Sequence, residues 1–509
     1  MARAAVAVSI LITFGATPVP GQARTQPRSS PAERAIALVG ATVIDGNGGA
    51  PLADATLILS GRKIAALGPR TSVSVPRGAQ LIDAAGKYLL PGFVDTNVHL
   101  SLYGGHAPER YETLVRYESR QADVVLEAAQ AQLKHGVTTV RDSYGVLAPL
   151  LEVRDRVARG ELIGPRMLVA GNIVGWGGPF SVSFSLYPQK GLTPFQERMN
   201  DAVAQGAGEE LMDMTPEELR VAINAYLDKG PDFIKYGGTG HTSTPTFIGF
   251  SPDAQRVIVE ETHKRGRVVE THSTTAEGLR LSVLAGIDLI QHPEYLDPRE
   301  LPDSLVRLIR ERDVICSLLS NTLTGEAWKE HLEKKQAAEK KLAETERKRG
   351  SRSDRVKTLA ERRREWEELG METELGRKNA QKLIAAGCSV TVGTDNYRAA
   401  APELRREPKP IYQDHGIGTI LGIEGLVELG MTPAQAIVAA TKNGARACRG
   451  LSELGTIEVG KLADLILLDA DPLADIHNIR KLRLVVKDGR IVDRDRLPER
   501  PIYETQAAP

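Results

Sequence analysis

Six side chains that could bind a metal ion or move a proton stand far apart in the sequence, and each follows a short apolar run. They are Asn97, His99, Lys235, His272, His292 and Asp395. Histidine nitrogens and carboxylate oxygens are the donors that zinc prefers in proteins. A single histidine in such a place is about as often a structural hydrogen-bonding group as a ligand. Their joint occurrence predicts a centre for one or two divalent metal ions, with zinc the preferred identity.

The elements that must position these side chains alternate between apolar strands and amphipathic helices over residues 91–445. The expected strands begin near residues 92, 138, 166, 233, 267, 289, 314 and 389, and expected helices include 216–228, 253–265 and 275–285. Eight strand–helix repeats predict an α/β fold, a parallel (β/α)8 TIM barrel rather than an open sheet. The active residues of such a barrel lie where the strands end, which is where the candidates stand.

Both ends of the chain have a different pattern from the middle. Residues 35–90 and 446–500 consist of short apolar runs separated by turn signals such as Asp45-Gly-Asn-Gly-Gly and Asp488-Gly489. Such runs predict strands and hairpins. We therefore expect one small β-sandwich domain built from both chain ends, followed by a tail at 501–509.

One segment inside the predicted barrel is rich in charge and almost free of glycine and proline. It covers residues 326–369, between the last two predicted strands. Charges of both signs at i, i+4 spacing stabilise solvated helices, and the Gly350-Ser-Arg-Ser stretch would separate two of them. The segment is either a lid or dimer contact, or a helical excursion with no role in the chemistry.

The first residues resemble an export signal. A positive charge at Arg3 precedes an apolar run from Ala4 to Ala16, and Ala23 offers a small-residue cleavage site. This pattern predicts a signal peptide over 1–23, a disordered lead-in over 24–34, and a periplasmic or secreted protein. The run is short for a membrane span, although an uncleaved N-terminal anchor is the alternative.

Charge and cysteine content exclude several classes of protein. Lysine plus arginine and aspartate plus glutamate number 65 each, so no overall field attracts nucleic acid or acidic lipid. The three cysteines, Cys316, Cys388 and Cys448, form no Cys-x-x-Cys pair, which excludes a thiolate zinc ribbon and argues against a disulfide framework. We expect a small-molecule partner, no nucleic acid, no membrane beyond export, and possible assembly into a homo-oligomer.

Several stretches together resemble the amidohydrolase superfamily, in its imidazolonepropionase-like and Xaa-Pro dipeptidase-like branch. The stretches are Ile82-Asp-Ala-Ala-Gly-Lys-Tyr-Leu-Leu-Pro-Gly-Phe-Val-Asp-Thr-Asn-Val-His99, Phe233-Ile-Lys-Tyr236, Thr271-His272, Ile290-Gln-His292, Val392-Gly-Thr-Asp395, Ala440-Thr-Lys-Asn-Gly-Ala-Arg-Ala447 and Gly455-Thr-Ile-Glu-Val-Gly-Lys-Leu-Ala-Asp-Leu465. They span nearly everything from residue 36 to 495. The resemblance implies a barrel joined to a split β-sandwich.

The resemblance also implies a role for each candidate. Lys235 would be carboxylated on its amine and bridge two ions, where the alternative is a salt-bridged lysine at a strand end. His99 and Asp395 would complete the shell of the first ion, and His272 and His292 would hold the second. Asp395 would also act as general base for the attacking water.

The chain departs from the family pattern at its first motif, where His-x-His is replaced by Asn97-x-His99. An amide oxygen is a weaker zinc ligand than imidazole. Asn97 could ligate a looser ion, hydrogen-bond a water in a one-ion site, or mark an inactive enzyme. The Asn-x-His variant also resembles phenylurea hydrolases, which favours an active site. Glu270 stands where many relatives carry a further histidine, and it could bind substrate or hold the loop.

The predicted activity is hydrolysis of a C–N bond by metal-activated water. The first expected substrates are dipeptides of the Xaa-Pro type or N-acyl amino acids, and the second are phenylureas, carbamates or cyclic amides. The rival from another class is a catalytically impaired metal- or ligand-binding protein. Weak candidates for substrate contact are Tyr103, Tyr236 and His241, because each follows a strand end; for each, packing is the more common role.

Overall fold

The computed structural model describes residues 34–103, 107–183, 191–241, 246–296, 299–349, 357–398, 401, 404 and 409–502. The expected signal peptide, the lead-in up to residue 33 and the tail from residue 503 lie outside these residues. In the part of the chain that is described, no helix is long and apolar enough to cross a membrane.

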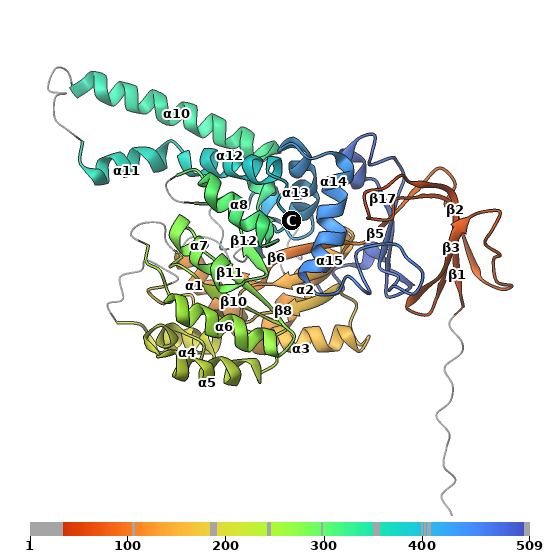
Figure 1. The fold of residues 1–509 in the computed structure, drawn as a ribbon, viewed down its shortest axis with the longest axis horizontal. Helices are drawn as coiled ribbons and strands as arrows, with labels where there is room; N and C mark the ends of the chain where they lie inside the picture. The colour runs from red at the N-terminus through yellow and green to blue at the C-terminus, as the bar shows by residue number, and fades with distance from the viewer. Residues whose placement is uncertain are drawn as a thin grey trace, which may run out of the picture.

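Strands from both chain ends lie in one mixed sheet, seen at the right of Figure 1. Its strand order is β18-β17-β16-β5-β1-β2-β3, and β4 pairs with β1. The bounds are β1 Ile36–Val43, β2 Leu52–Ser60, β3 Lys63–Pro69, β4 Gln80–Asp83, β5 Tyr88–Pro91, β16 Leu465–Leu468, β17 Leu482–Lys487 and β18 Arg490–Ile491. Leu38, Leu57 and Leu465 pack in its core. The hydrogen-bond pairing of these strands defines one sheet. That the sheet folds into the two layers of a β-sandwich stays a prediction.

The middle of the chain forms two parallel sheets, which confirms the α/β class. One has the order β14-β13-β12-β11-β10-β9 and the other β15-β6-β7-β8. The bounds are β6 Phe93–Tyr103, β7 Val137–Asp142, β8 Arg166–Val169, β9 Ile173–Val174, β10 Phe233–Gly237, β11 Val268–His272, β12 Leu289–Gln291, β13 Ile315–Leu318, β14 Val390–Val392 and β15 Asn396–Arg398. Their near-continuous burial is typical of parallel strands covered on both faces.

Two connecting segments lead from one parallel sheet into the other. One joins β8 to β9 and contains Gly171 at φ +75°; the other joins β14 to β15 and contains Asp395 at φ +54°. A left-handed residue turns the chain out of a strand, so the ladder is interrupted at both places. The Asp395 amide nevertheless donates to the carbonyl of Asn97 across the second gap at 2.8 Å. Closure of all strands into one TIM barrel stays a prediction.

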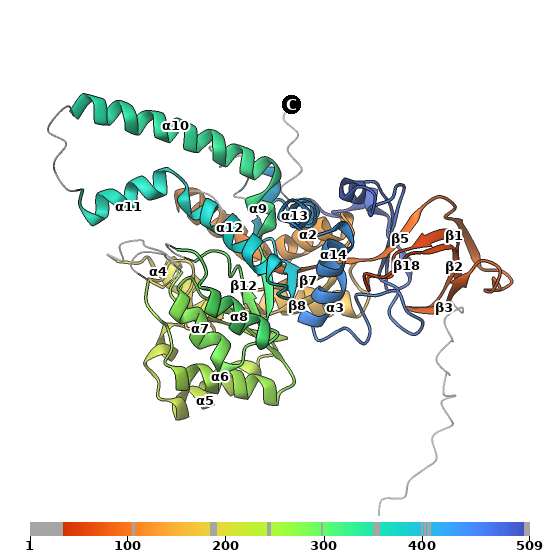
Figure 2. The ribbon, with the colours of Figure 1, turned by 45° about the horizontal axis from the view of Figure 1, so that its top comes forward.

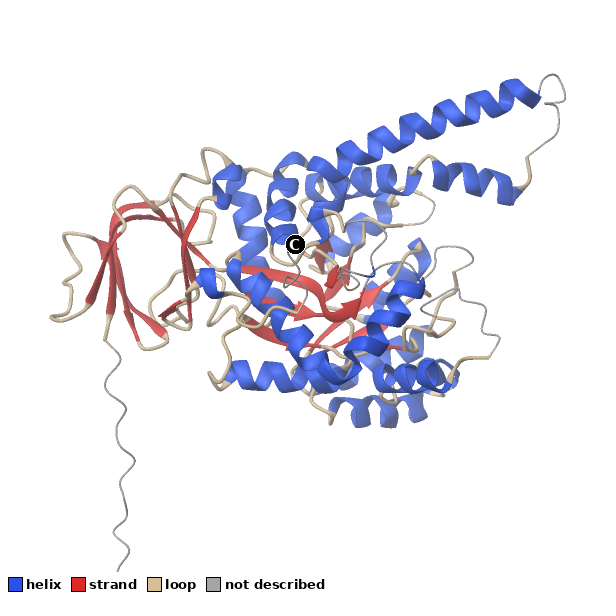
Figure 3. Cartoon of the chain, turned by 180° about the vertical axis from the view of Figure 1, so that it is seen from behind, coloured by secondary structure: helices blue, strands red, loops and turns tan. Residues whose placement is uncertain are grey.

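Helices surround the parallel strands (Figure 3). They are α1 Ala107–Tyr117, α2 Gln121–Lys134, α3 Leu147–Ala158, α4 Pro194–Ala204, α5 Pro216–Leu227, α6 Pro252–Lys264, α7 Ala276–Ala285, α8 Asp303–Glu311, α9 Ser320–Leu323, α12 Met371–Ala385, α13 Ile417–Glu428, α14 Pro433–Val438 and α15 Gly444–Ala447. Thr193, Thr215 and Thr432 each close a capping box before a proline at the helix start. These caps satisfy amides that the first turn leaves unpaired.

The charged segment forms two helices that project away from the rest of the molecule (Figures 1 and 2). They are α10 Gly325–Arg349 and α11 Leu359–Glu368, inserted between β13 and β14. Lys357, just before α11, pairs with Glu346 of α10 at 3.1 Å, and Arg363 pairs with Glu367 within α11 at 3.0 Å. The expected helix pair is therefore present, while the expected break at 350–353 lies outside the described residues.

Candidate active site

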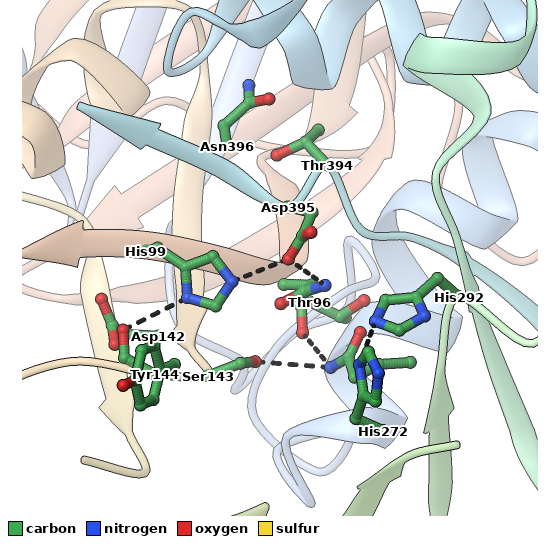
Figure 4. A network of polar contacts seen from close by, with 12 residues as sticks. Thr96, His99, Asp142, Ser143, Tyr144, His272, His292, Thr394, Asp395 and Asn396 are labelled. Carbon is green, nitrogen blue, oxygen red and sulfur yellow. Dashed lines mark hydrogen bonds and ion pairs between the residues drawn. The ribbon is translucent and has the colours of Figure 1, made fainter. Parts of the chain in front are cut away.

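The predicted site residues come from five strands of the parallel sheets. Figure 4 shows four of them, His99, His272, His292 and Asp395, lying close together. Asn97 and His99 alternate on β6 and therefore share one face of the strand. Lys235 lies in β10, His272 ends β11, and His292 directly follows β12. Asp395 lies between β14 and β15, where the left-handed turn presents its side chain. All of these except Asp395 are buried, and the Asp395 side chain is 38% exposed.

His99 and Asp395 form the first pair of the site. His99 Nε2 lies 2.7 Å from Asp395 Oδ1, and Asn97 Nδ2 donates to the same oxygen at 3.0 Å. His99 Nδ1 donates to the carbonyl of Tyr144 at 3.2 Å, because a carbonyl can only accept. This second hydrogen bond fixes the ring with Nε2 toward the carboxylate. Two nitrogens and one carboxylate oxygen thus meet at a position open to solvent.

His272 and His292 form the second pair. His272 Nδ1 lies 3.0 Å from His292 Nε2, and His272 Nε2 has no hydrogen-bond partner among the described residues. Burial lowers the pKa of His272 well below its usual range, helped by His292, and lowers that of His292 to about 4 against the attraction of Asp395. Both rings are therefore neutral at pH 7, and neutral imidazole is the form that ligates metal ions.

Lys235 acts electrostatically on both pairs. Its charge influences the pKa of Asp395, His272 and His292. Burial lowers the pKa of Lys235 although Asp395 and other nearby carboxylates oppose the change. A lowered pKa increases the share of neutral amine, which is the nucleophilic form of lysine. The alternative of a salt-bridged lysine is not seen, since no ion pair joins Lys235 to another residue in the described ranges.

The Asp395 carboxylate is held in its ionised form. The partial burial of the carboxyl group would by itself raise its pKa, but the charge and hydrogen bond of His99, together with His292 and Lys235, lower the pKa well below its usual range. The loop that carries it is fixed by Asp95, which accepts from the amide of Thr394 at 3.2 Å and from its hydroxyl at 2.8 Å. Asp395 is thus an anion at neutral pH on a constrained loop, as a base or ligand must be.

Glu270 lies beneath the site and is committed to a buried ion pair. Arg141 Nη2 donates to Glu270 Oε2 at 2.5 Å, and Gln291 Nε2 donates to Glu270 Oε1 at 2.9 Å. The Arg141 guanidinium also lies 3.8 Å from the centre of the Phe233 ring and donates to the Ala447 carbonyl. Of the two roles considered for Glu270, substrate binding is not supported, because both its oxygens are occupied and fully buried.

Breaking this ion pair should destabilise the fold. Glu270→Gln leaves the Arg141 cation buried without a counter-charge, and we expect a loss of roughly 3–5 kcal/mol in the free energy of unfolding. Replacing both partners, Glu270→Leu with Arg141→Met, should recover most of it. Urea unfolding followed by circular dichroism measures the change. The exposed pair Arg280–Glu277 provides the control, and Glu277→Gln should leave the unfolding midpoint unchanged.

Two buried carboxyl groups near the site are not among the residues selected from the sequence. Asp142 ends β7 and accepts from the amide of Leu100 at 2.6 Å, and burial raises its pKa to about 7. Glu294 accepts from the amide of Leu319 at 2.6 Å, and burial raises its pKa to about 8. Both follow apolar runs, so the strand-end rule that selected the other candidates would also have found them.

The three weak candidates for substrate contact differ in position. Tyr236 is fully buried on the helix side of β10, where its hydroxyl donates to Gln255 of α6 at 2.8 Å, so the structure does not bring it to the site. Alternation along the strand explains this, because Lys235 points to the opposite face. The side chain of Tyr103 lies outside the described part. His241 is exposed and stacks on His272, with ring centres 5.7 Å apart.

The donors present fit a metal centre in two halves. In the described ranges, no three histidine, cysteine, aspartate or glutamate side chains lie close enough together to hold an ion by themselves. The candidates form two pairs, His99 with Asp395 and His272 with His292. The charge of Lys235 acts on the pKa of residues in both pairs. Asn97 Oδ1 is buried and has no hydrogen-bond partner among the described residues. A buried acceptor without a partner is costly, and a cation or water next to it would remove that cost.

Comparison with known proteins identifies the family of the chain. The model of the Amidohydrolase family matches residues 88–492, which is most of the chain. The chain therefore belongs to the amidohydrolase family. The resemblance that the sequence motifs predicted is confirmed.

Three relatives align with nearly the whole chain. The structure of phenylurea hydrolase B is 31% identical with a TM-score of 0.79, and the match covers 93% of this chain and 100% of that one. The structure of molinate hydrolase is 30% identical with a TM-score of 0.78, covering 94% and 98%. Ochratoxinase of Aspergillus niger is 24% identical over 473 residues, which are 90% of this chain and 87% of the relative. The chain is thus a hydrolase that acts on carbon–nitrogen bonds.

Proposed function

We propose that the protein hydrolyses the C–N bond next to a carbonyl in a small molecule and that it needs one or two divalent metal ions, zinc for preference. The observation that carries this proposal is the pairing of His99 with Asp395 and of His272 with His292 around the buried Lys235. Each pair offers two donors of the types that bind zinc. Carboxylation of Lys235 would add an oxygen donor to both pairs.

The bound ions would activate the attacking water and polarise the substrate carbonyl. Asn97 would contribute its unpartnered Oδ1 to the half of the site that contains His99. Lys235 is suited to carboxylation because its amine is buried and its pKa is lowered, and the neutral amine is the form that adds carbon dioxide. The product is an anion, which replaces a buried cation by a group that can bind cations.

Asp395 would move the proton. Its ionised Oδ atoms accept a proton from the attacking water while the water oxygen forms a bond to the carbonyl carbon. The same carboxyl group then returns the proton to the leaving nitrogen as the C–N bond breaks. Asn97 Nδ2 and His99 Nε2 both face Oδ1, so they orient the carboxylate and hold its proton-accepting form. The exposure of Asp395 leaves it accessible to water and substrate.

Among substrate classes, uncharged ureas and carbamates are favoured over molecules with a free carboxylate. A dipeptide or N-acyl amino acid needs a cation for its carboxylate, and within the described ranges the strand-end cation Arg141 is occupied by Glu270. Arg398 and Lys409, which follow Asp395 in the chain, are bound to Glu127 and to the Tyr397 carbonyl. The Asn97-x-His99 motif and the similarity to phenylurea hydrolase B support the same class. Dipeptides and N-acyl amino acids are the second candidate.

A hydrolysis screen tests the proposal. We expect zinc-loaded protein to release amine from phenylureas or N-aryl carbamates at least tenfold faster than from Xaa-Pro dipeptides or N-acyl amino acids. Dialysis against a chelator should abolish turnover, and added zinc should restore it. Metal analysis should find one to two ions in each chain. Turnover that survives complete metal removal would contradict the metal-dependent mechanism, and a metal-loaded protein that hydrolyses none of these compounds would favour the impaired binding protein.

The architecture and location proposed for the enzyme follow from the same reasoning. We propose that the two parallel sheets act as one TIM barrel over residues 91–445, because the chain passes between them at both interruptions. The mixed sheet, with residues 35–90 and 446–500, would be the accessory domain. The apolar run after Arg3 supports export to the periplasm or the medium.

A further inference from the structure

A short hairpin next to the candidate ligands carries side chains that the catalytic proposal does not use. We define the mouth hairpin as residues 238–241 and 246–249. Gly249 N donates to the Gly238 carbonyl at 3.1 Å, Gly240 N donates to the Phe247 carbonyl at 3.0 Å, and Thr239 pairs with Ile248 between them. These bonds give the hairpin a defined antiparallel register directly after β10.

His241 connects the mouth hairpin to the site. Its ring stacks on that of His272, with centres 5.7 Å apart and planes 27° apart. The Trp176 indole meets both rings edge-on, at 5.2 Å from His241 and 4.7 Å from His272, and donates from Nε1 to the Thr239 carbonyl at 3.0 Å. The His241 amide also donates to the carbonyl of Ser183 at 3.3 Å. An exposed imidazole is therefore held against a candidate metal ligand by contacts on several sides.

The register of the hairpin decides which residues share a face with His241. Directly paired residues of antiparallel strands lie on one face, and alternate residues along a strand do so as well. Ile248, paired with Thr239, therefore shares the face of His241, and the residue is 42% exposed. Phe247, paired with Gly240, lies on the other face and is 46% exposed. The hairpin thus exposes one apolar side chain on the His241 face and one on the opposite face.

We propose that His241 and Ile248 form a specificity subsite for a flat, uncharged, apolar group attached to the scissile carbonyl or nitrogen. The inference rests on the proposed function for the location of the reacting bond. A planar group can stack on the imidazole, which itself lies against His272, and pack against the branched aliphatic side chain on the same face of the hairpin. The subsite selects flat rings over flexible chains by shape.

The test uses binding of two probes that cannot be hydrolysed at a carbonyl. N-phenylmethanesulfonamide and N-butylmethanesulfonamide share one head group and differ in the flat or flexible group attached. Calorimetric titration of zinc-loaded protein should show tighter binding of the phenyl probe. His241→Ala and Ile248→Ala should each reduce the phenyl-over-butyl preference by roughly three- to tenfold. His241→Phe keeps a flat ring and should retain the preference.

Phe247→Ala is the matched control, because it removes an equally exposed apolar side chain from the other face of the same hairpin and should leave the preference unchanged. Equal phenyl and butyl affinities in the unmodified protein, an unchanged preference in both alanine variants, or an equal loss in Phe247→Ala would overturn the subsite. Binding needs no turnover. Failure of every hydrolysis assay would therefore refute the proposed function and leave a positive binding result standing.

Discussion

Asp395→Asn should lower kcat by roughly a hundred- to ten-thousandfold, which is the range that general acid–base catalysis contributes. The asparagine side chain cannot take a proton from water, and its amide nitrogen would meet the donor Asn97 Nδ2 if it replaced the Oδ1 atom. The amide oxygen can still face this donor, so the fold should be kept. Initial rates on the best substrate of the screen, together with the metal content of the purified variant, measure the effect.

The matched control for this variant is Asp475→Asn. Asp475 is exposed and caps a short helical turn by accepting from the amide of His477 at 3.0 Å. Its replacement removes the same charge outside the site and should leave kcat unchanged. Full turnover in Asp395→Asn would show that the proton is moved by another group. A rate loss that disappears when zinc is raised would assign Asp395 to metal binding alone.

Lys235→Ala should remove activity by roughly a thousandfold or more and lower the metal content of the purified protein. The variant loses the group proposed to bridge the two donor pairs, and with it several kcal/mol of charge stabilisation in the transition state. Alanine leaves space beside the pairs, so a short carboxylic acid such as propionate should restore part of the activity by supplying the missing oxygens. Activity and metal content at increasing propionate concentration provide the measurement.

A direct readout accompanies the lysine variant. Protein equilibrated with carbon-13 bicarbonate should show a carbamate carbon signal by NMR, and Lys235→Ala should lack that signal. Lys442→Ala is the control, because Lys442 is a partly buried lysine that is not among the candidate ligands and donates to Asn47 Oδ1 at 2.9 Å. Full activity and full metal content in Lys235→Ala would refute the bridging role and would make Lys235 a structural residue.

Asn97 explains why the two halves of the site need not bind metal equally. The half with His99 contains an amide oxygen and a carboxylate, whereas the other half contains two neutral imidazoles. Zinc prefers the nitrogen donors, so the half with His272 and His292 should retain its ion more tightly. Stepwise chelation should then release one ion before the other, and the expected metal content lies between one and two ions in each chain.

The strands and their ends could be predicted from local sequence. All eight predicted barrel strands correspond to β6, β7, β8 and β10–β14, with first residues displaced by at most one position, although β6 continues to Tyr103. The reason is that buried parallel strands need continuous apolar runs, and such runs are visible without knowledge of the fold. The short strands β9 and β15 were missed, because two or three residues contain no recognisable periodicity.

The sequence by itself determined which residue types follow the strands and therefore which chemistry is available, because strand ends and their polar neighbours are local features. Only the tertiary structure decided which side chains meet. Asn97 and Asp395 are 298 positions apart in the chain, yet they share a hydrogen bond. Because side chains alternate along β10, Tyr236 faces helix α6 and not the site. Glu270 forms a buried ion pair with Arg141 and is therefore not available to a substrate. These outcomes depend on packing between distant segments, which no local pattern encodes.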